Sequence, residues 1–182
     1  MTSATINTTN TTIVNTMIIN TIQTPAGPLT LTERNGCITH CLFTPHQATE
    51  SPLTKGTIQG KNTSPILRTA KRQFDEYFAG QRIEFDLPLA PAGTPFQQRV
   101  WAALQTIPYG ETWSYQQLAR HTGKPNACRA VGTANAKNPV GIIIPCHRVI
   151  LASGKPGSYA GGNDLKVKLL RFEQEGVSIA AA

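Results

Sequence analysis

The side chains best suited to covalent chemistry in this chain are a cysteine and a histidine that stand next to each other, Cys146 and His147. A thiolate is a strong nucleophile, and a nearby imidazole can take the proton that a thiol must lose. The pair follows the apolar run 140–144 and Pro145, so we expect a buried strand that ends in a stiff turn and fixes the sulfur. The alternative is an unreactive core cysteine, since free cysteine is among the most buried residue types.

The positive charge of the chain gathers in its second half. Residues 1–91 hold seven Lys/Arg against six Asp/Glu, whereas residues 92–182 hold ten against four, out of a net charge of +7. Such an excess suits a polyanionic partner, above all nucleic acid. A solvated basic face is the alternative.

The length and the cysteines bound the class of protein. A chain of 182 residues can form one large or two small domains whose core needs neither disulfide nor metal. Its four cysteines show no regular framework and no secretory signal opens the chain, so we expect reduced thiols inside a cell. No apolar run approaches the roughly 20 residues that span a bilayer. We expect a cytoplasmic protein, or a nuclear one in a eukaryote, with no membrane segment and no cofactor.

The first part of the chain favours a weakly ordered leader followed by a small α/β domain. Residues 1–15 are rich in Thr and Asn, and residues 16–91 alternate short apolar segments with turn signals. The expected elements are a strand at 17–22, a hairpin of 29–32 and 38–43 around Asn35-Gly36, a Ser/Thr-rich loop at 49–64, a helix at 66–78 and a closing strand at 83–87.

Four residues near the hairpin have the types that zinc prefers: Cys37, His40, Cys41 and His46. Successive side chains of a strand point to opposite faces, so Cys37 and Cys41 lie on one face and His40 on the other. These residues cannot easily converge on one ion, and we predict no metal site here.

Residues 92–178 are expected to form a second, helical domain. The Pro/Ala/Gly-rich stretch 88–93 has linker composition, and the segment 94–97 (TPFQ) combines an N-cap, a proline and a capping glutamine. The segment 114–117 (SYQQ) begins a second capped helix, and a third begins at Ala127. Two short helices joined by a tight turn indicate a helix-turn-helix, although a helical hairpin in an ordinary core has the same pattern.

The third helix is unusual for a helix that recognises bases in the major groove. Its residues between Ala127 and Ala136 are nearly all small, which leaves few side chains to contact base edges. A bare helix can instead approach the minor groove, where Arg129 could enter the base stack. Tight helix packing is the alternative explanation of the small residues.

Six segments of the second half, taken together, resemble the signatures of the O6-alkylguanine-DNA alkyltransferases. They are 93–96 (GTPF), 114–119 (SYQQLA), 129–132 (RAVG), 138–139 (NP), 145–150 (PCHRVI) and 159–162 (YAGG). The resemblance implies an α+β protein with a ribonuclease-H-like N-terminal domain and a winged-helix-like C-terminal domain. It also implies a repair protein that moves an alkyl group, chiefly methyl, from O6 of guanine irreversibly onto its own cysteine.

The same resemblance assigns the reaction chemistry. Cys146 becomes the acceptor, His147 its base, and Glu173 the acid that orients the histidine. From the residues alone, Glu173 would be a solvated carboxylate near a helix end. Tyr115 is implied to donate a hydrogen bond to N3 of guanine. Because neighbouring side chains of an extended segment point apart, a water or a turn must connect His147 to Cys146.

The remaining implied site residues surround the base and the DNA. The carbonyls of Cys146 and Val149 would accept from the exocyclic amine of guanine, the amide of Ala160 would face O6, and Tyr159 would pack on the base. Asn138 would brace the active-site turn, although an Asx turn before Pro139 explains it equally well. The further residues implied at the DNA surface are Ser114, Ala127, Cys128, Arg129 and Gly132.

The expected partner is therefore double-stranded DNA that carries O6-alkylguanine, with O4-alkylthymine as an open alternative, bound by a monomer that flips the base through the minor groove. Two alternative functions remain at this point. A helix-turn-helix regulator would bind DNA without chemistry, and a Cys-His-Glu hydrolase would turn over repeatedly and ignore DNA.

Overall fold

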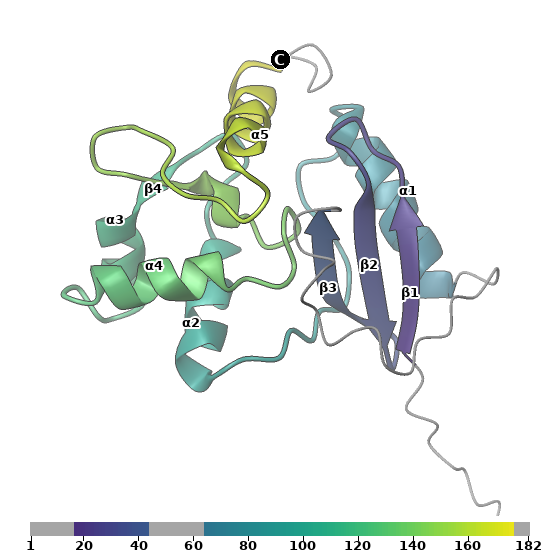
Figure 1. The fold of residues 1–182 in the computed structure, drawn as a ribbon, viewed down its shortest axis with the longest axis horizontal. Coiled ribbons are helices and arrows are strands. Elements are labelled where there is room, and N and C mark those ends of the chain that lie inside the picture. The colour runs from purple at the N-terminus through teal and green to yellow at the C-terminus, as the bar shows by residue number, and fades with distance from the viewer. Residues whose placement is uncertain (1–16, 44–63, 177–182) are drawn as a thin grey trace, which may run out of the picture.

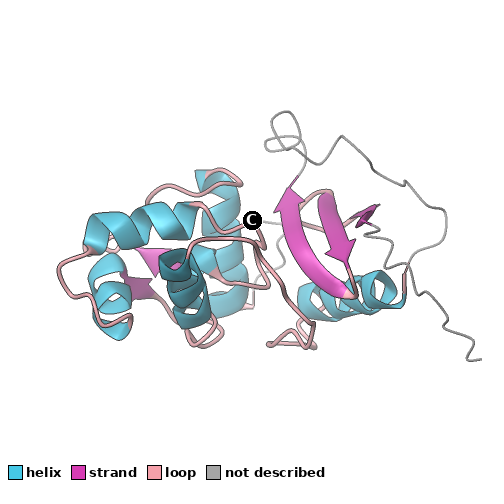
Figure 2. Ribbon diagram, turned by 90° about the horizontal axis from the view of Figure 1, so that it is seen from below, coloured by secondary structure: helices cyan, strands magenta, loops and turns pink. Residues whose placement is uncertain are grey.

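The computed structural model describes residues 17–43 and 64–176, which form two units joined by an extended segment (Figure 1). The N-terminal unit is an antiparallel sheet in the order β1-β2-β3, made of β1 (Met17–Ile22), β2 (Leu29–Arg34) and β3 (Cys37–Phe43). Helix α1 (Pro65–Phe78) packs on one face of this sheet (Figures 1 and 2). The hairpin turn is at Asn35-Gly36, both in the left-handed region with φ of 52° and 76°.

The predicted closing strand at 83–87 is wrong. These residues are irregular, and Ile83 is 58% exposed. Both backbone polar groups of Asp86 bond to the side-chain amide of Gln73 on α1, at 2.9 Å for the N–H and 2.8 Å for the carbonyl. A side chain thus takes the place of a neighbouring strand. The segment joins the sheet later, in a single parallel bridge between Leu89 and Ile38.

The C-terminal unit is helical, as expected, with a two-stranded parallel sheet in it. Its elements are α2 (Pro95–Leu104), β4 (Trp113–Ser114), α3 (Tyr115–His121), α4 (Cys128–Ala136), the 3-10 turn η2 (Cys146–Arg148), β5 (Val149–Ile150) and α5 (Asn163–Glu175). The predicted caps of α2 and α3 are both present as reciprocal capping boxes, with Thr94 and Gln97 at the first and Ser114 and Gln117 at the second.

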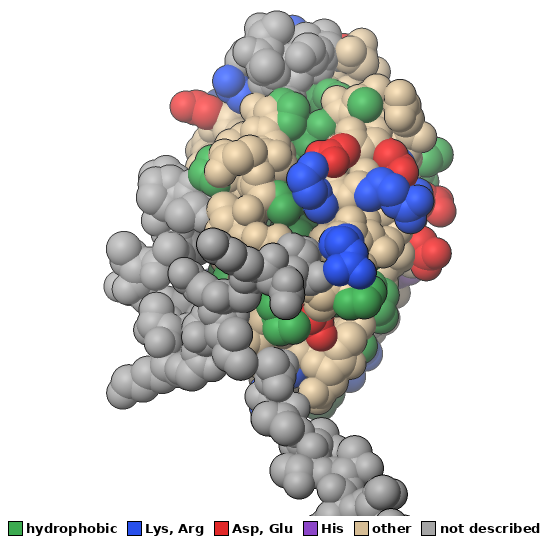
Figure 3. All heavy atoms as spheres, turned by 90° about the vertical axis from the view of Figure 1, so that its right-hand side faces the viewer, with side chains coloured by type: hydrophobic (Ala, Val, Ile, Leu, Met, Phe, Trp, Pro, Cys, Tyr) green, Lys and Arg blue, Asp and Glu red, His purple; other side chains and the backbone are tan. Residues whose placement is uncertain are grey.

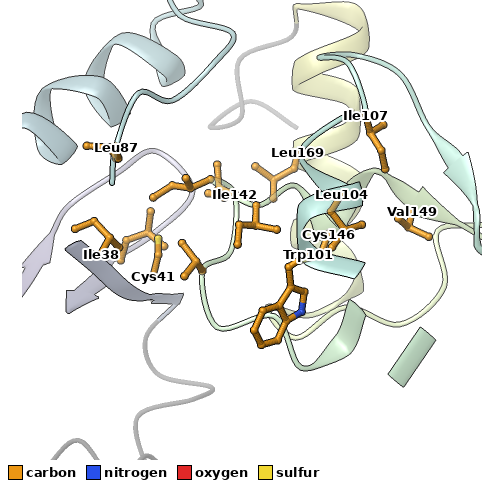
Figure 4. Close-up of a cluster of buried hydrophobic side chains, with 14 of the residues drawn as sticks. Ile38, Cys41, Leu87, Trp101, Leu104, Ile107, Ile142, Cys146, Val149 and Leu169 are labelled. Atoms are coloured by element: carbon orange, nitrogen blue, oxygen red, sulfur yellow. The ribbon is translucent and has the colours of Figure 1, made fainter. Parts of the chain in front are cut away.

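One hydrophobic core runs through both units (Figure 4). The loop after α4 lies against β3, where the amide of Cys41 donates to the carbonyl of Pro139 at 2.8 Å and the amide of Gly141 donates to the carbonyl of Cys41 at 2.9 Å. Cys41, Ile142 and Cys146 therefore belong to the same buried cluster. The N-terminal unit consequently helps to position the loop that leads to Cys146.

Positive and negative side chains are interspersed on the outer face of the N-terminal unit (Figure 3). On α1, Lys71 pairs with Asp75 and Arg72 with Glu76. Such exposed pairs contribute little to stability, and this face has no excess of one sign. Among the helices that the structure describes, none has the length and apolar character needed to cross a membrane.

Trp101 joins α2 to α4 and provides a test of this packing. Its ring is 2% exposed and its Nε1 donates to the carbonyl of Ala134 at 2.9 Å. We expect Trp101→Phe to lower the free energy of unfolding by about 2–4 kcal/mol. The substitution removes buried ring atoms and leaves the buried Ala134 carbonyl without the indole donor. Urea denaturation measures this change. Trp113→Phe, at a half-buried position, is the matched control and should lower the free energy of unfolding clearly less. Equal losses of stability in the two variants would contradict the buried, hydrogen-bonded role of Trp101.

Candidate active site

The apolar run 140–144 is buried, but the predicted strand is wrong. The chain forms a tight turn in which Val140 bridges to Cys41 of β3, Gly141 bridges to Ile144 within the run, and Ile142 has a φ of 66°. A β-branched residue in that region is strained unless its surroundings hold it there. Asn138 supplies the bonds: its Oδ1 accepts from the amide of Val140 at 3.0 Å, and its Nδ2 donates to the carbonyl of Ile144 at 2.8 Å.

This turn delivers Cys146 to the start of η2, with its amide bonded to the carbonyl of Ile144 at 2.8 Å. The residue is 5% exposed. Burial raises the pKa of the Cys146 thiol, and the Asn138 side chain and the charge of Lys166 oppose that rise. At rest the thiol is thus protonated, and it needs a base to become a nucleophile.

His147 and Glu173 form a buried contact between η2 and α5. Nε2 of His147 lies 2.9 Å from Oε1 of Glu173, and the side chains are 0% and 1% exposed. An ionised carboxylate can only accept, so Nε2 carries the proton and donates it to this bond. The other ring nitrogen, Nδ1, is buried and has no hydrogen-bond partner in the described structure. The imidazole therefore holds an unused lone pair beside the cysteine.

Other donors also converge on the Glu173 carboxylate. Arg148 donates from Nε to Oε2 at 2.8 Å and from Nη2 to Oε1 at 3.0 Å, Tyr77 donates its hydroxyl proton to Oε1 at 2.6 Å, and the amide of Gly110 donates to Oε2 at 3.3 Å. Burial alone would raise the pKa of Glu173, but His147 and Arg148 outweigh it and hold that pKa well below its usual range. The interpretation of Glu173 as a solvated carboxylate is wrong.

Tyr115 lies near Cys146. Burial, and the charge that Cys146 would carry, raise the pKa of the Tyr115 hydroxyl, which keeps it a neutral donor. Its ring rests against Gly132 of α4, where a Cβ would sit 3.6 Å from the ring, and a Cβ at Gly157 would sit 3.6 Å from its hydroxyl. Glycines on α4 and on the loop between β5 and α5 thus lie against this phenol.

Val149 is fully buried, and its carbonyl accepts from Nζ of Lys166 at 2.6 Å. Lys166 is itself 0% exposed and has no carboxylate partner among the described ion pairs. Burial lowers the pKa of Lys166 from 10.5 to about 8, while the Cys146 charge acts in the opposite direction. A thiolate at Cys146 would provide the missing countercharge.

Tyr159 and Ala160 line a narrow pocket beside Cys146, together with residues of β3 and the turn. The Tyr159 ring meets the His147 ring edge-on at 6.5 Å. A Cβ at Gly161 would lie 2.9 Å from the Tyr159 ring and 2.8 Å from Leu165, so this close packing requires a glycine.

The expected DNA-contacting residues are not part of the buried network. Arg129 is exposed at the start of α4, Ala127 is the N-cap position, and the Cys128 thiol donates to the carbonyl of Pro125 at 3.9 Å. Ser114 caps α3. The structure thus separates the predicted residues into a buried group around Cys146 and a second group at the start of α3 and on α4, which is half-buried except for the exposed Arg129.

Four polar side chains of the buried group were missed by the sequence analysis: Tyr77, Asn135, Arg148 and Lys166. Asn135 is 4% exposed, and its Nδ2 donates to the carbonyl of Cys146 at 3.4 Å. Tyr77 and Lys166 each occupy a buried position of an otherwise amphipathic helix. That position, where an apolar residue is expected, was the only signal available in the sequence.

Across residues 17–43 and 64–176, no three His, Cys, Asp or Glu side chains lie close enough to hold an ion. His46, the leader 1–15 and most of the loop 49–64 fall outside the described residues.

Two family models match the chain. The ribonuclease-like domain of 6-O-methylguanine DNA methyltransferase matches residues 17–91, and the DNA-binding domain of the same family matches residues 95–175. A methylated-DNA–protein-cysteine methyltransferase from Methanosarcina barkeri is 44% identical over 158 residues, which is 87% of this chain and 98% of that protein. The protein of the same name from Mycobacterium tuberculosis is 49% identical over 154 residues, or 85% of this chain and 90% of that one.

Solved structures agree with these matches. The chain is similar to Mycobacterium tuberculosis OGT in complex with DNA, with a TM-score of 0.82 and 44% identity over 90% of this chain and 96% of that one. Because both units are covered, the expected two-domain fold is confirmed.

The buried carboxylate makes stability depend on pH in a defined direction. Since the folded pKa of Glu173 lies below the 4.5 of an ordinary carboxyl, its contribution is present above that pH and is lost as the pH falls further. We expect Glu173→Gln to cost about 3–5 kcal/mol at neutral pH, because Arg148 loses its countercharge. Denaturant unfolding at a series of pH values should show this cost shrinking in acid.

Glu175→Gln is the control for this measurement. Glu175 lies on the same helix and pairs with Arg171, but both side chains are about half exposed. Its replacement should change stability by less than about 1 kcal/mol at every pH. A cost of Glu173→Gln that stays constant from neutral to acid pH would contradict the pKa assignment.

Proposed function

The chain belongs to the 6-O-methylguanine DNA methyltransferase family and repairs alkylated DNA by direct reversal, and we propose that Cys146 is the cysteine that accepts the alkyl group. Membership excludes the non-catalytic regulator and the hydrolase as descriptions of this protein. The observation that carries the proposal for Cys146 is the neighbouring imidazole, which is bonded to Glu173 through Nε2 and has a buried Nδ1 without a partner.

Activation of the thiol begins at Nδ1 of His147. We infer that one water bridges Nδ1 and Sγ, because Cys146 and His147 are consecutive residues of a 3-10 turn and no direct bond joins their side chains. The water passes the thiol proton to Nδ1. The positive charge on the ring is then stabilised by the Glu173 carboxylate, as in other acid-histidine-nucleophile arrangements.

The transfer step breaks one bond and forms one. Sγ attacks the alkyl carbon while the bond from that carbon to O6 breaks, and the electron pair leaves with guanine. The products are a thioether at Cys146 and an unmodified guanine, which is neutral once it gains a proton. Because nothing in this scheme removes the thioether, each protein molecule acts once.

We propose that groups around the sulfur recognise the leaving guanine. Tyr115, a neutral donor, is proposed to bond N3 of the base, and the carbonyls of Cys146 and Val149 to accept from its exocyclic amine. Asn135 and Lys166 hold those two carbonyls in place. The Ala160 amide would then face O6. Since Cys146 is 5% exposed, we expect the loop that carries Tyr159 and Ala160 to move when a base enters.

DNA is the partner, and the damaged base must leave the duplex to reach a buried sulfur. We propose that α4 lies in the minor groove and that Arg129, exposed at its start, fills the space that the flipped nucleotide vacates. The small residues of α4, including the half-buried Cys128 and Gly132, would let the helix come close to the sugar-phosphate backbone. O6-alkylguanine is the proposed substrate, with O4-alkylthymine as a weaker candidate.

The assignment of the acceptor is tested by locating the transferred group. We expect excess duplex with O6-methylguanine to add one methyl group per protein molecule, on the peptide that contains Cys146, and peptide mass spectrometry measures both quantities. Cys146→Ala should abolish the transfer. Cys41→Ala and Cys128→Ala are the matched controls and should retain it. A methyl group found on another cysteine, or repeated turnover, would contradict the assignment of Cys146 as the acceptor.

The role of Arg129 is tested by comparing duplex with single-stranded substrate. Base extrusion costs a few kcal/mol in a duplex and less in a single strand. We therefore expect Arg129→Ala to slow methyl transfer about tenfold or more on duplex DNA, with a much smaller effect on a single strand. Arg99→Ala, which removes the same charge from α2, should affect both substrates alike. If Arg129→Ala slowed methyl transfer equally on duplex and single-stranded DNA, the role of Arg129 in base extrusion would be contradicted.

A further inference from the structure

We propose that Tyr77 of the N-terminal unit is a positioning residue for alkyl transfer, because its hydroxyl holds the oxygen of Glu173 that orients His147. This inference rests on the proposed function and extends it. Tyr77 lies on α1, 96 residues before Glu173 in the chain, and its hydroxyl is 2.6 Å from Oε1. It gives the N-terminal unit a direct hydrogen bond to the proposed catalytic groups.

Tyr77 shares its acceptor atom with the histidine. Oε1 of Glu173 accepts from the Tyr77 hydroxyl, from Nε2 of His147 at 2.9 Å and from Nη2 of Arg148 at 3.0 Å. Oε2 is occupied by Nε of Arg148 and the Gly110 amide. Donors therefore surround both oxygens, and the carboxylate cannot rotate without losing one of them. Tyr77 is the donor on Oε1 that comes from outside the C-terminal unit.

The hydroxyl has little freedom to point elsewhere. The Tyr77 side chain is 0% exposed, and its ring contacts Phe85, Tyr109 and Phe172 with centroids 5.3, 6.1 and 5.2 Å away. Burial and the Glu173 charge raise the pKa of Tyr77 well above its usual value, so it stays a neutral donor. Most aromatic neighbours of this ring are phenylalanines, which fill a core equally well. The hydroxyl is thus the feature that packing alone does not require.

Loss of this donor would change the histidine in a defined direction. The hydrogen bond from Tyr77 withdraws negative charge from Oε1, which tempers the attraction of that oxygen for a protonated imidazole. Without it, Oε1 carries more negative charge and attracts a positively charged imidazole more strongly. The acidic limb of the transfer rate should then move to higher pH. The carboxylate would also be held less firmly, which lowers the rate at its plateau.

Other ionisable groups face this network from every element packed against it. They are Cys146 and Arg148 on η2, Lys166 and Glu173 on α5, Cys41 on β3, Tyr115 on α3, Tyr109 before β4, Tyr159 on its loop and Tyr77 itself on α1. Tyr77→Phe leaves all the others in place. A displaced pH profile in this variant can therefore be assigned to the missing hydroxyl.

The experiment compares Tyr77→Phe with Tyr109→Phe. Tyr109 is the matched control, since its ring touches Tyr77 and lies 5.7 Å from the Arg148 guanidinium, but no hydrogen bond of its hydroxyl is found in the described structure. Single-turnover methyl transfer from O6-methylguanine duplex is measured against pH, with thermal unfolding of each variant alongside. We expect Tyr77→Phe to lower the plateau rate about tenfold and to move the acidic limb upward. Tyr109→Phe should follow the wild type.

If folded Tyr77→Phe kept both the plateau rate of methyl transfer and the acidic limb of its pH profile unchanged, the inference would be overturned, even if the melting temperature fell. Should Tyr77→Phe not fold, site-specific 3-fluorotyrosine at 77 keeps the ring and makes the hydroxyl a stronger donor. The limb should then move to lower pH, and a limb that stays in place would overturn the inference. Wild-type protein that transfers no methyl to Cys146 would instead refute the proposed function.

Discussion

The structure depends on one buried negative charge. The Glu173 carboxylate accepts from an arginine, a histidine, a tyrosine and a backbone amide, and these donors come from three segments: η2, α1 and the turn before β4. A buried carboxylate is costly unless such donors surround it, so these three segments and α5 must pack in one arrangement. The same bond that satisfies the charge fixes the His147 ring. Folding and the proposed chemistry thus share a single requirement.

A second constraint acts on the sulfur. Burial disfavours the thiolate that the reaction needs, and the resting protein thereby protects Cys146 from unwanted chemistry. The opposing groups are already in place: Asn138 at the turn, Lys166 without a carboxylate partner and the free Nδ1 of His147. Each of them favours negative charge at Sγ or takes its proton. A flipped nucleobase that displaces the Tyr159 loop would meet a thiol that becomes a nucleophile once its proton has passed to His147.

Local sequence signals predicted the parts of the fold that local chemistry controls. The hairpin at Asn35-Gly36 and the helix starts at Thr94 and Ser114 are confirmed, because turn and cap bonds involve residues close in sequence. The strands expected at 83–87 and 140–144 are wrong, because distant or flanking side chains, Gln73 and Asn138, take over the backbone bonds. The place of Glu173 in the site came only from family resemblance. The Tyr77 contact spans 96 residues and has no local signature.

The central claim is that Glu173 holds His147 with Nε2 protonated and Nδ1 free to act as a base. Nitrogen-15 NMR of the imidazole in the resting protein at neutral pH measures this most directly, since the two ring nitrogens have distinct shifts when one carries the proton. We predict a neutral His147 ring with the proton on Nε2, and loss of that single tautomer in Glu173→Gln. A proton on Nδ1 in the wild-type protein would contradict the claim, because that nitrogen could not then accept the proton of Cys146.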